Sequence, residues 1–337
     1  MFASDNAAGI HPRVLAAIEA ANRGRALAYG HDGFTAAANA RLREVFGATA
    51  EPLLVFGGTG ANVLALRTMV DSYQSVVCAA SSHVWVDECS APERFVGKLV
   101  PIATATGKLT PDAVREVLHG FGDVHHAQPR AISVAQATEW GTVYRPEELA
   151  ALAELAHAHD MVLHLDGARL SNAAAALDLP LGAFGRDAGV DVLSFGGTKN
   201  GLLGAEAVIF FDPELARRAG FHRKQLMQLA SKMRFLAVQI ETRLEGELWR
   251  ELASHANAMA RRLGDGLAAL PGITLTQPVE TNAVFAALPP AAVAPMQAAG
   301  YFHMWDAARS IVRLMTAWDT EPAEVDAFLA AARQTLG

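Results

Sequence analysis

The sequence predicts an α/β fold built around a mainly parallel sheet that helices cover on both faces. Short, wholly apolar segments alternate with helical patterns along the first two thirds of the chain. Strands that are apolar throughout are typical of parallel sheets, because such sheets are buried on both faces. At 337 residues, the chain is long enough for one large core and a smaller second domain.

The chain is predicted to open with an N-terminal segment, residues 1–12, and then two helices. The first helix starts at Pro12 and closes at Gly24, because proline is favoured in the first helical turn and glycine after the last. The second spans residues 33–46. The large domain is expected to cover residues 13–245.

Seven apolar segments are predicted to form the large sheet, because each is short and bounded by turn residues. They span residues 53–56, 75–79, 98–102, 131–135, 161–165, 190–195 and 205–211. The helices predicted between them include residues 60–70, 111–118, 146–159 and 168–176.

The last third of the chain is predicted to form a smaller α+β domain, residues 246–337. A long helix over residues 226–245 leads into it. Within the small domain the patterns indicate a helix over 247–267, strands near 273–275, 283–287 and 311–315, and a final helix from Ala323.

Composition excludes several kinds of partner. A net charge of −7 argues against nucleic acid and against an anionic membrane surface. No apolar run approaches the ~18–20 residues that cross a bilayer, and the first residues lack the features of a signal peptide. The only cysteines, Cys78 and Cys89, have no CxxC spacing and are expected to be reduced. We therefore expect a cytoplasmic protein.

Lys199 is the most unusual residue of the sequence. It lies among glycines and hydroxyl residues directly after the apolar segment 190–195, whereas surface lysines normally keep their ammonium group hydrated. A lysine held in such a pocket can lose its proton and attack a carbonyl group. The alternative is a turn lysine that binds a phosphate or the backbone.

A glycine-rich turn, Gly57–Gly60, separates a predicted strand from a predicted helix. The N–H groups of such a turn and the N-terminus of the following helix bind phosphate, with Gly58 and Thr59 as the contact residues. Neither a GxGxxG nor a GxxxxGK[ST] spacing is present, so a single phosphate is the better ligand. The alternative is an ordinary turn.

The segment His164-Leu165-Asp166-Gly167-Ala168-Arg169 marks a predicted strand end, where ligand sites of open α/β sheets form. Asp166 could keep a ring nitrogen protonated, and Arg169 could bind a carboxylate through two hydrogen bonds. The alternative is a helix-capping aspartate beside a surface arginine.

Two histidines complete the candidate site. His83 follows a predicted strand and could stack on a flat cofactor or act as a base, and His125 precedes another strand. Both could instead be ordinary loop histidines. A phosphate-binding turn, Asp166 and Lys199 together fit pyridoxal phosphate, whose phosphate, ring nitrogen and aldehyde need three groups of these kinds.

Over essentially its whole length the chain resembles the low-specificity L-threonine aldolases, which have the aspartate-aminotransferase-like fold type I of pyridoxal-phosphate enzymes. Five motifs carry the resemblance. They are Ser4-Asp5-Asn6, Tyr29-Gly30-His31-Asp32, Gly57-Gly58-Thr59-Gly60-Ala61-Asn62, His164-Leu165-Asp166-Gly167-Ala168-Arg169 with Asn172, and Thr198-Lys199-Asn200-Gly201.

The resemblance implies reversible cleavage of L-threonine, L-allo-threonine and L-phenylserine to glycine and an aldehyde. It implies that Lys199 forms a Schiff base with the cofactor and that Asp166 keeps the nitrogen of the cofactor ring protonated. The base for the β-hydroxyl is expected to be His83, which would also stack on the ring, or His125. The substrate is expected to contact Ser4, Arg169 and Arg313, and the cofactor is expected to contact Arg169 and Arg234. Tyr29 is expected to contact the substrate in the site of a neighbouring subunit of a homotetramer, a dimer of dimers.

Two departures put the substrate range in question. Many family members carry Leu-Ser-Lys-Gly-Leu at the lysine, where this chain has Gly-Gly-Thr-Lys-Asn-Gly, and their Glu-Asn-Thr-His is replaced by Ala135-Gln136-Ala137-Thr138. Other pyridoxal-phosphate reactions, β-elimination or racemisation, stay as alternatives, because they share the cofactor chemistry and differ in which substrate bond is aligned. A metal-dependent hydrolase is the alternative from another class, with the candidate ligands His125, His126, His157 and His159. No metal is expected, because the sequence contains no HExxH motif.

Overall fold

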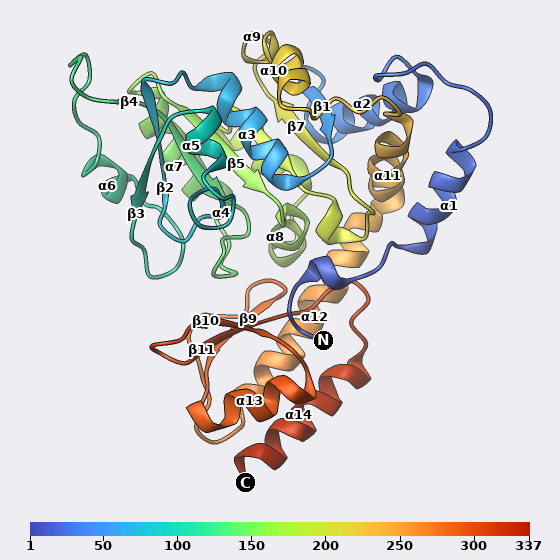
Figure 1. Ribbon diagram of the computed structural model, residues 1–337, viewed down its shortest axis with the longest axis vertical. Helices are drawn as coiled ribbons and strands as arrows, with labels where there is room; N and C mark the ends of the chain where they lie inside the picture. Colours follow the sequence, from blue (N-terminus) through green and yellow to red (C-terminus); the bar gives the residue numbers. More distant parts are fainter.

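A seven-stranded sheet forms the centre of the larger body of the computed structural model, which describes residues 1–337 (Figure 1). Its strand order is β1-β7-β6-β5-β4-β2-β3. Only β7 runs antiparallel to its neighbours, β1 and β6, and every other pair is parallel. The predicted α/β fold with a mainly parallel seven-stranded sheet is confirmed.

Each predicted strand of this sheet is present, with shifts at its ends. The strands are β1 Glu51–Val55, β2 Gln74–Ala79, β3 Lys98–Ile102, β4 Gln128–Ala135, β5 Val162–Gly167, β6 Val192–Phe195 and β7 Glu206–Phe210. The register aligns Ala135 of β4 with Asp166 of β5, and Asp166 with Ser194 of β6. The carboxyl ends of three neighbouring strands are therefore level.

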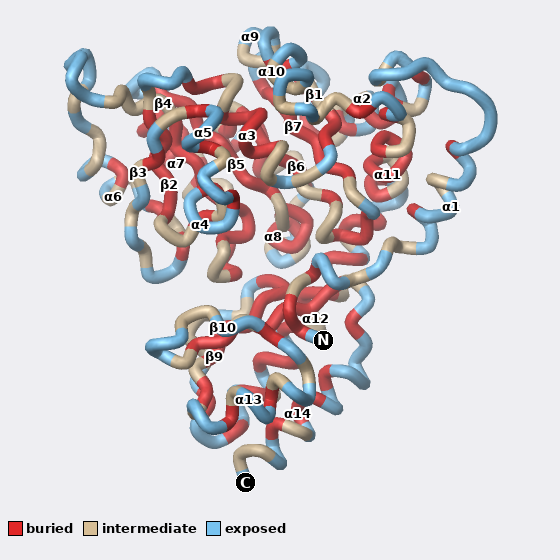
Figure 2. The backbone as a smooth tube through the Cα atoms, in the orientation of Figure 1, coloured by how far each residue is buried: buried red, intermediate tan, exposed pale blue.

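Helices cover both faces of this sheet. They are α1 Pro12–Ala21, α2 Gly33–Phe46, α3 Gly58–Met69, α4 His83–Val86, α5 Ala91–Phe95, α6 Pro111–Arg115, α7 Pro146–His157, α8 Leu170–Leu177, α9 Pro213–Ala216, α10 Ala219–Gln225 and α11 Arg234–Leu244. One apolar cluster joins the sheet to α1, α2, α7, α8 and α11, and another joins it to α3 on the opposite face. Figure 2 shows buried residues concentrated along the central strands, with exposed residues on the outer loops.

The prediction of one continuous helix over residues 226–245 is wrong in its first part. Helix α10 ends at Gln225, and α11 begins only at Arg234. Met227 has φ of 61°, a left-handed conformation that interrupts a right-handed helix. The helix predicted over residues 111–118 is also shorter in the structure, where α6 ends at Arg115.

The smaller body has its own antiparallel sheet and its own core. Its strands are β8 Thr274–Leu275, β9 Ala283–Ala287, β10 His303–Asp306 and β11 Ile311–Met315, and its helices are α12 Leu248–Ala268, α13 Pro290–Ala299 and α14 Pro322–Leu336. Helix α13 is not among the predicted helices, because Pro289, Pro290 and Pro295 give the segment the composition of a loop. None of the helices combines the length and the apolar character that crossing a membrane requires.

The N-terminal segment is anchored in the smaller body (Figure 1). The Phe2 N–H donates to the carbonyl of Tyr301 at 2.7 Å, and the Phe2 carbonyl accepts from the Met315 N–H at 2.8 Å. The Phe2 ring is buried and packs on Phe328 with centroids 5.0 Å apart. The next residues form a short 3₁₀ helix, η1 Asp5–Ala7, that faces the larger body.

Candidate active site

The loop that carries Lys199 follows β6 and contains a single 3₁₀ turn, η4 Thr198–Asn200. Two glycines precede this turn because neighbouring chain segments come too close for a side chain. A Cβ atom on Gly196 would lie 2.6 Å from the backbone of Ala168. A Cβ atom on Gly197 would clash with the carbonyl of Ala205. The glycines therefore let the lysine loop pack directly against the end of β5.

Two buried charged side chains, Glu206 and Arg243, form hydrogen bonds with this loop. The Glu206 carboxylate accepts hydrogen bonds from the Gly197 N–H and, at 2.6 Å, from the Thr198 hydroxyl. The Arg243 guanidinium donates to the Gly196 carbonyl at 2.6 Å and stacks on Phe195 at 4.2 Å. Burial raises the pKa of Glu206 and lowers the pKa of Arg243 to about 10. No local motif marks either residue, so reasoning from the sequence missed both.

The Lys199 side chain is partly buried, and its amine forms no hydrogen bond or ion pair. The positive charge of Arg169 lowers the pKa of Lys199, and desolvation lowers it further. Both effects increase the fraction of neutral amine at a given pH. The structure therefore gives Lys199 the properties of a nucleophilic amine.

Asp166 lies at the carboxyl end of β5 and is buried. One carboxylate oxygen accepts from the Asn62 amide at 2.7 Å, and the other accepts from the Ala168 N–H at 3.0 Å. These two hydrogen bonds fix the plane of the carboxylate.

His164, two residues earlier on β5, is fully buried between neighbouring strands. Its Nδ1 lies 2.9 Å from the Ser133 hydroxyl and its Nε2 lies 3.0 Å from the Ser194 hydroxyl. Burial lowers the pKa of His164 to about 4, so the ring is neutral at pH 7. His164 therefore links three strands beneath Asp166 and is a structural histidine.

The N-terminus of α3 faces a cavity of about 360 Å³ at the carboxyl ends of the strands. Gly57 caps this helix without a side-chain hydrogen bond, and the N–H groups of Gly58 and Thr59 have no backbone partner. Gly58, Thr59, His83, Asp166 and Lys199 all line this cavity. The structure thus brings together these five predicted site residues.

A second cavity of about 230 Å³ adjoins the first, and Asn6, His83 and Lys199 line both. The predicted substrate residues Ser4, Arg169 and Arg313 line only the second cavity. Glu139, which the sequence did not indicate, lines it as well.

The two arginines of the second cavity differ in how many of their N–H groups donate hydrogen bonds. Arg169 donates from Nε and Nη2 to the two carboxylate oxygens of Asp5, at 2.7 and 2.8 Å. Arg313 donates only to the carbonyl of Ala3, at 3.4 Å, and its Nε is buried without a partner. Desolvation and the nearby charge of Arg169 lower the pKa of Arg313. Arg313 is therefore the less engaged of the two arginines and keeps more of its donors free for an anion.

His83, the first residue of α4, is fixed by two carboxylates. Its Nδ1 lies 2.8 Å from Glu88 Oε1, and its backbone N–H donates to Glu139 Oε1 at 2.7 Å. The hydrogen bond with Glu88 raises the pKa of His83. Asn62 donates to the same Glu88 oxygen at 2.8 Å, so one asparagine connects His83 with Asp166.

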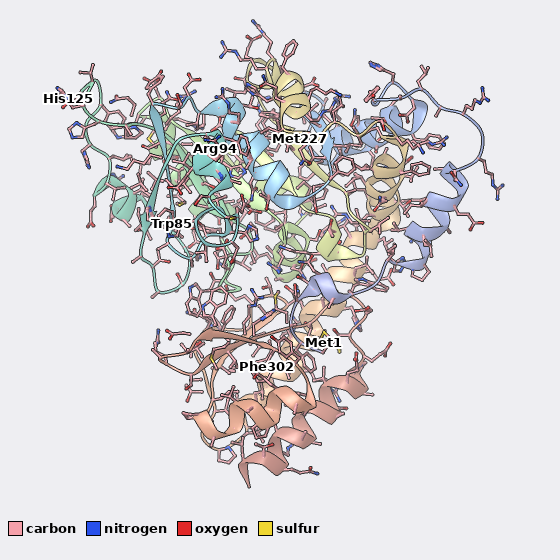
Figure 3. The ribbon with its side chains drawn as sticks, in the orientation of Figure 1. Met1, Trp85, Arg94, His125, Met227 and Phe302 are labelled. Carbon is pink, nitrogen blue, oxygen red and sulfur yellow. The ribbon has the colours of Figure 1, made fainter.

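The structure does not place His125, one of the two histidines predicted as the base, in either cavity of this chain. His125 is exposed at the outer edge of the larger body, in the loop before β4 (Figure 3). The Gln128 amide donates to the carbonyls of Gly120, Asp123 and His126 and folds this loop on itself, away from both cavities. His126 pairs with Asp123, and His157 pairs with Asp191. No three His, Cys, Asp or Glu side chains of the chain are grouped to hold a metal ion.

Tyr29 and Arg234 line neither cavity within one chain. They lie near each other on a different surface. The Tyr29 N–H donates to the Ser231 carbonyl at 2.9 Å, and Arg234 donates to the Gly24 carbonyl at 3.2 Å. Tyr29 is 46% exposed.

The first cavity fits pyridoxal phosphate. Free N–H groups at the start of α3 suit the phosphate, the Asp166 carboxylate suits the ring nitrogen, and the unpaired Lys199 amine suits the aldehyde. The site also lies at the carboxyl ends of a mainly parallel sheet, where such folds bind their ligands. Fold and site together define a pyridoxal-phosphate-dependent enzyme of fold type I.

Comparison with known proteins gives the family. A family model described as beta-eliminating lyase matches residues 1–289. A low specificity L-threonine aldolase of Pseudomonas aeruginosa is 44% identical over 322 residues, 95% of this chain and 93% of the relative. Another, from a Pseudomonas species, is 43% identical over 326 residues, 96% of this chain and 94% of the relative. The chain therefore belongs to the beta-eliminating lyase family and, within it, to the low-specificity L-threonine aldolases.

Solved structures agree with this assignment. The structure of a Leishmania major threonine aldolase superposes with a TM-score of 0.95 at 29% identity, covering 100% of this chain and 99% of the other. The aspartate aminotransferase of Thermus thermophilus superposes with a TM-score of 0.70 at 17% identity, over 98% of this chain and 89% of the other. The second likeness concerns the fold alone.

Proposed function

We propose that the protein cleaves L-β-hydroxy-α-amino acids to glycine and an aldehyde, and forms them again when glycine is in excess. L-Threonine, L-allo-threonine and L-phenylserine are the proposed substrates. The observation that carries this proposal is that the Lys199 amine and the free donors of Arg313 face one cavity, beside the cavity that fits the cofactor. The threonine aldolase relatives support the same activity.

In this proposal the first cavity holds the cofactor. Gly58 and Thr59 bind its phosphate, Asp166 binds its ring nitrogen, His83 lies against its ring, and Lys199 is the point of attachment. When bound, pyridoxal phosphate supplies an electron sink for a bond that breaks at the substrate α-carbon. The lowered pKa of Lys199 favours the neutral amine that this attachment needs.

The second cavity holds the substrate. Arg313 binds the substrate carboxylate, because its Nε has no partner and its charge is only partly compensated. Arg169 contributes positive charge, while its bonds to Asp5 fix its position. Ser4 is a further hydrogen-bonding group in this cavity. Anchoring the carboxylate orients the bond between the α- and β-carbons for cleavage.

An aldehyde-release assay tests the function. The purified protein with pyridoxal phosphate is given the stereoisomers of threonine, allo-threonine and phenylserine, and the products are identified. We expect acetaldehyde or benzaldehyde together with glycine. Release of a keto acid and ammonia would show β-elimination, and inversion at the α-carbon without cleavage would show racemisation; either result would contradict the proposal.

We further propose a homotetramer, a dimer of dimers, whose active sites lie at subunit interfaces. Phe56 and Leu203 line the first cavity, yet both are largely exposed in the single chain. Leu27, Tyr29 and Met227 are also exposed, and burying such apolar surface favours association. In this arrangement Tyr29 and Arg234 reach the site of the neighbouring subunit. Light scattering during size-exclusion chromatography measures the mass, and a monomer would contradict the proposal.

The proposal also covers the cellular compartment and the domain boundaries. We place the protein in the cytoplasm, because Cys78 and Cys89 are both free thiols. We divide the chain into an N-terminal segment, residues 1–12, a large domain, residues 13–245, and a small domain, residues 246–337. The separate apolar core around β9 and β11 supports the last boundary, and limited proteolysis near residue 246 tests it.

A further inference from the structure

We propose that Glu139 is the catalytic base that takes the proton from the β-hydroxyl of the substrate. This inference rests on the proposed aldol cleavage, which requires such a base. Glu139 lies in the loop after β4 and lines the second cavity together with Lys199 and Arg313. It is thus a proton-accepting group in the space assigned to the substrate.

The Glu139 carboxylate has one committed oxygen and one free oxygen. Oε1 accepts the hydrogen bond from the backbone N–H of His83 at 2.7 Å. Oε2 is buried and has no hydrogen-bond partner. A buried carboxylate oxygen without a partner is costly, and a substrate hydroxyl in the adjoining cavity would satisfy it.

The backbone around Glu139 is held in a tight turn. The Thr138 N–H donates to the Thr142 carbonyl at 2.9 Å, and the Gly141 N–H donates to the Thr138 carbonyl at 2.9 Å. The Thr138 and Thr142 hydroxyls are 2.7 Å apart. Glu139 is therefore positioned before any ligand binds, as a base that acts on one specific proton should be.

The two histidines that the sequence offered as bases suit this step less well. His125 lies in an exposed loop on another part of the molecule. His83 lies in the site, but its Nδ1 is already engaged by Glu88, and the proposed function places its ring against the cofactor ring. Unlike these histidines, Glu139 is a carboxylate that lines the second cavity and keeps an oxygen without a partner.

The surroundings of Glu139 raise its pKa toward neutral pH. Burial and, to a smaller degree, the charge of Asp166 raise the pKa of Glu139 to about 7, although the bond from His83 opposes this shift. The other titratable groups that interact with Glu139 are Arg169, Cys78 and Tyr144. A base works best when its pKa lies near the working pH.

The proton transfer and the cleavage of the bond between the α- and β-carbons balance without any further reactant. The hydroxyl proton passes to the Glu139 carboxylate, and the O–H electron pair becomes the second bond of the aldehyde carbonyl. The bond between the α- and β-carbons breaks, and its electron pair stays with the α-carbon. That fragment takes up one proton and leaves as glycine, while Glu139 returns its proton to solvent.

Glu139→Gln tests the inference, because the Gln carbonyl still accepts the His83 N–H but the side chain no longer takes up a proton. We expect kcat for aldehyde release from L-threonine to fall by about 100-fold or more, a typical loss when a general base is removed. We also expect the rise of kcat with pH through about 7 to disappear.

A second readout separates a base from a structural residue. Glycine has no β-hydroxyl, so exchange of its α-proton in D₂O, followed by NMR, does not need Glu139. The Glu139→Gln protein should therefore retain the wild-type exchange rate and the wild-type change in visible absorbance when glycine is added. Glu93→Gln, an exposed carboxylate on α5, is the matched control and should leave both reactions unchanged.

Each other outcome overturns something specific. If Glu139→Gln releases aldehyde at the wild-type rate, Glu139 is not the base. If aldehyde release and glycine exchange fall together, Glu139 only supports the structure of the site, and the inference is also wrong. If the wild-type protein exchanges glycine but releases no aldehyde from any substrate, the proposed function itself fails.

Discussion

Asp5 and Arg169 form a buried, two-point ion pair, with Nε 2.7 Å from one carboxylate oxygen and Nη2 2.8 Å from the other. Burial opposes the ionisation of Asp5, but the charge and hydrogen bonds of Arg169, together with Lys199 and Asn282, outweigh it and lower the pKa of Asp5. Asp5 also accepts from the Asn282 amide of the smaller body at 3.0 Å. One N-terminal carboxylate therefore joins the start of α8 to the small sheet.

Asp5→Asn should destabilise the protein strongly, because it leaves the buried Arg169 charge without compensation. We expect the free energy of unfolding to fall by about 3–5 kcal/mol. Urea unfolding at fixed protein and cofactor concentration measures it. The matched control is Asp326→Asn, which breaks an exposed two-point pair with Arg262 and should cost far less stability, because solvent screens exposed charges. Equal losses in the two variants would show that burial of the Asp5 pair has no effect.

Lys199→Ala should abolish the visible absorbance of lysine-bound cofactor and the release of aldehyde, because no other amine lines the first cavity. Absorbance spectra of the purified protein with pyridoxal phosphate measure the first effect. Lys98→Ala, which removes an exposed lysine of β3, should change neither property. Retained activity in Lys199→Ala would contradict the assignment of the nucleophile.

Arg313→Lys should raise KM for L-threonine by about 10- to 100-fold, because a lysine cannot bind a carboxylate through two parallel hydrogen bonds. Steady-state kinetics of aldehyde release measure the change. Arg309→Lys, an exposed position between β10 and β11, provides the control. An unchanged KM in Arg313→Lys would assign the substrate carboxylate to another residue.

Stability should fall as the pH drops from 6.5 toward 4, and His164 should contribute to this fall. Its pKa is about 4 in the folded protein, against the ordinary histidine value of 6.5, so the unfolded chain binds the proton more tightly in this window. Because the unfolded chain binds more protons in this range, the free energy of unfolding falls by up to ~3 kcal/mol between pH 6.5 and pH 4. The full contribution of His164 is present above pH 6.5. His164→Asn should flatten the dependence of the unfolding free energy on pH, whereas the exposed His303→Asn should not.

Most of the fold and the centre of the site can be predicted from the sequence for the same physical reason. Wholly apolar segments can be placed only in a buried sheet, and polar residues directly after them fall at the carboxyl ends of parallel strands. Asp166 and Lys199 are of this kind. His125 precedes β4 and so lies at the amino end of its strand, where the same rule places no ligand site.

The residues that the sequence did not reveal depend on contacts between distant segments. Glu206 and Arg243 support the Lys199 loop from β7 and α11, and each looks like an ordinary residue of its own element. Glu139 meets His83 across 56 positions of sequence. Neither periodicity nor a local motif contains such pairings, because they arise only when the strands assemble.

The anchoring of Phe2 beside β11 also constrains how the protein is made. Phe2 leaves the ribosome long before Met315, which bonds to its backbone. Contacts of this sequence separation form late, because a long stretch of chain must first be ordered. A nascent chain can therefore build its large sheet early, but Ser4 and Asp5 reach their places only after the segment around β11 has been made.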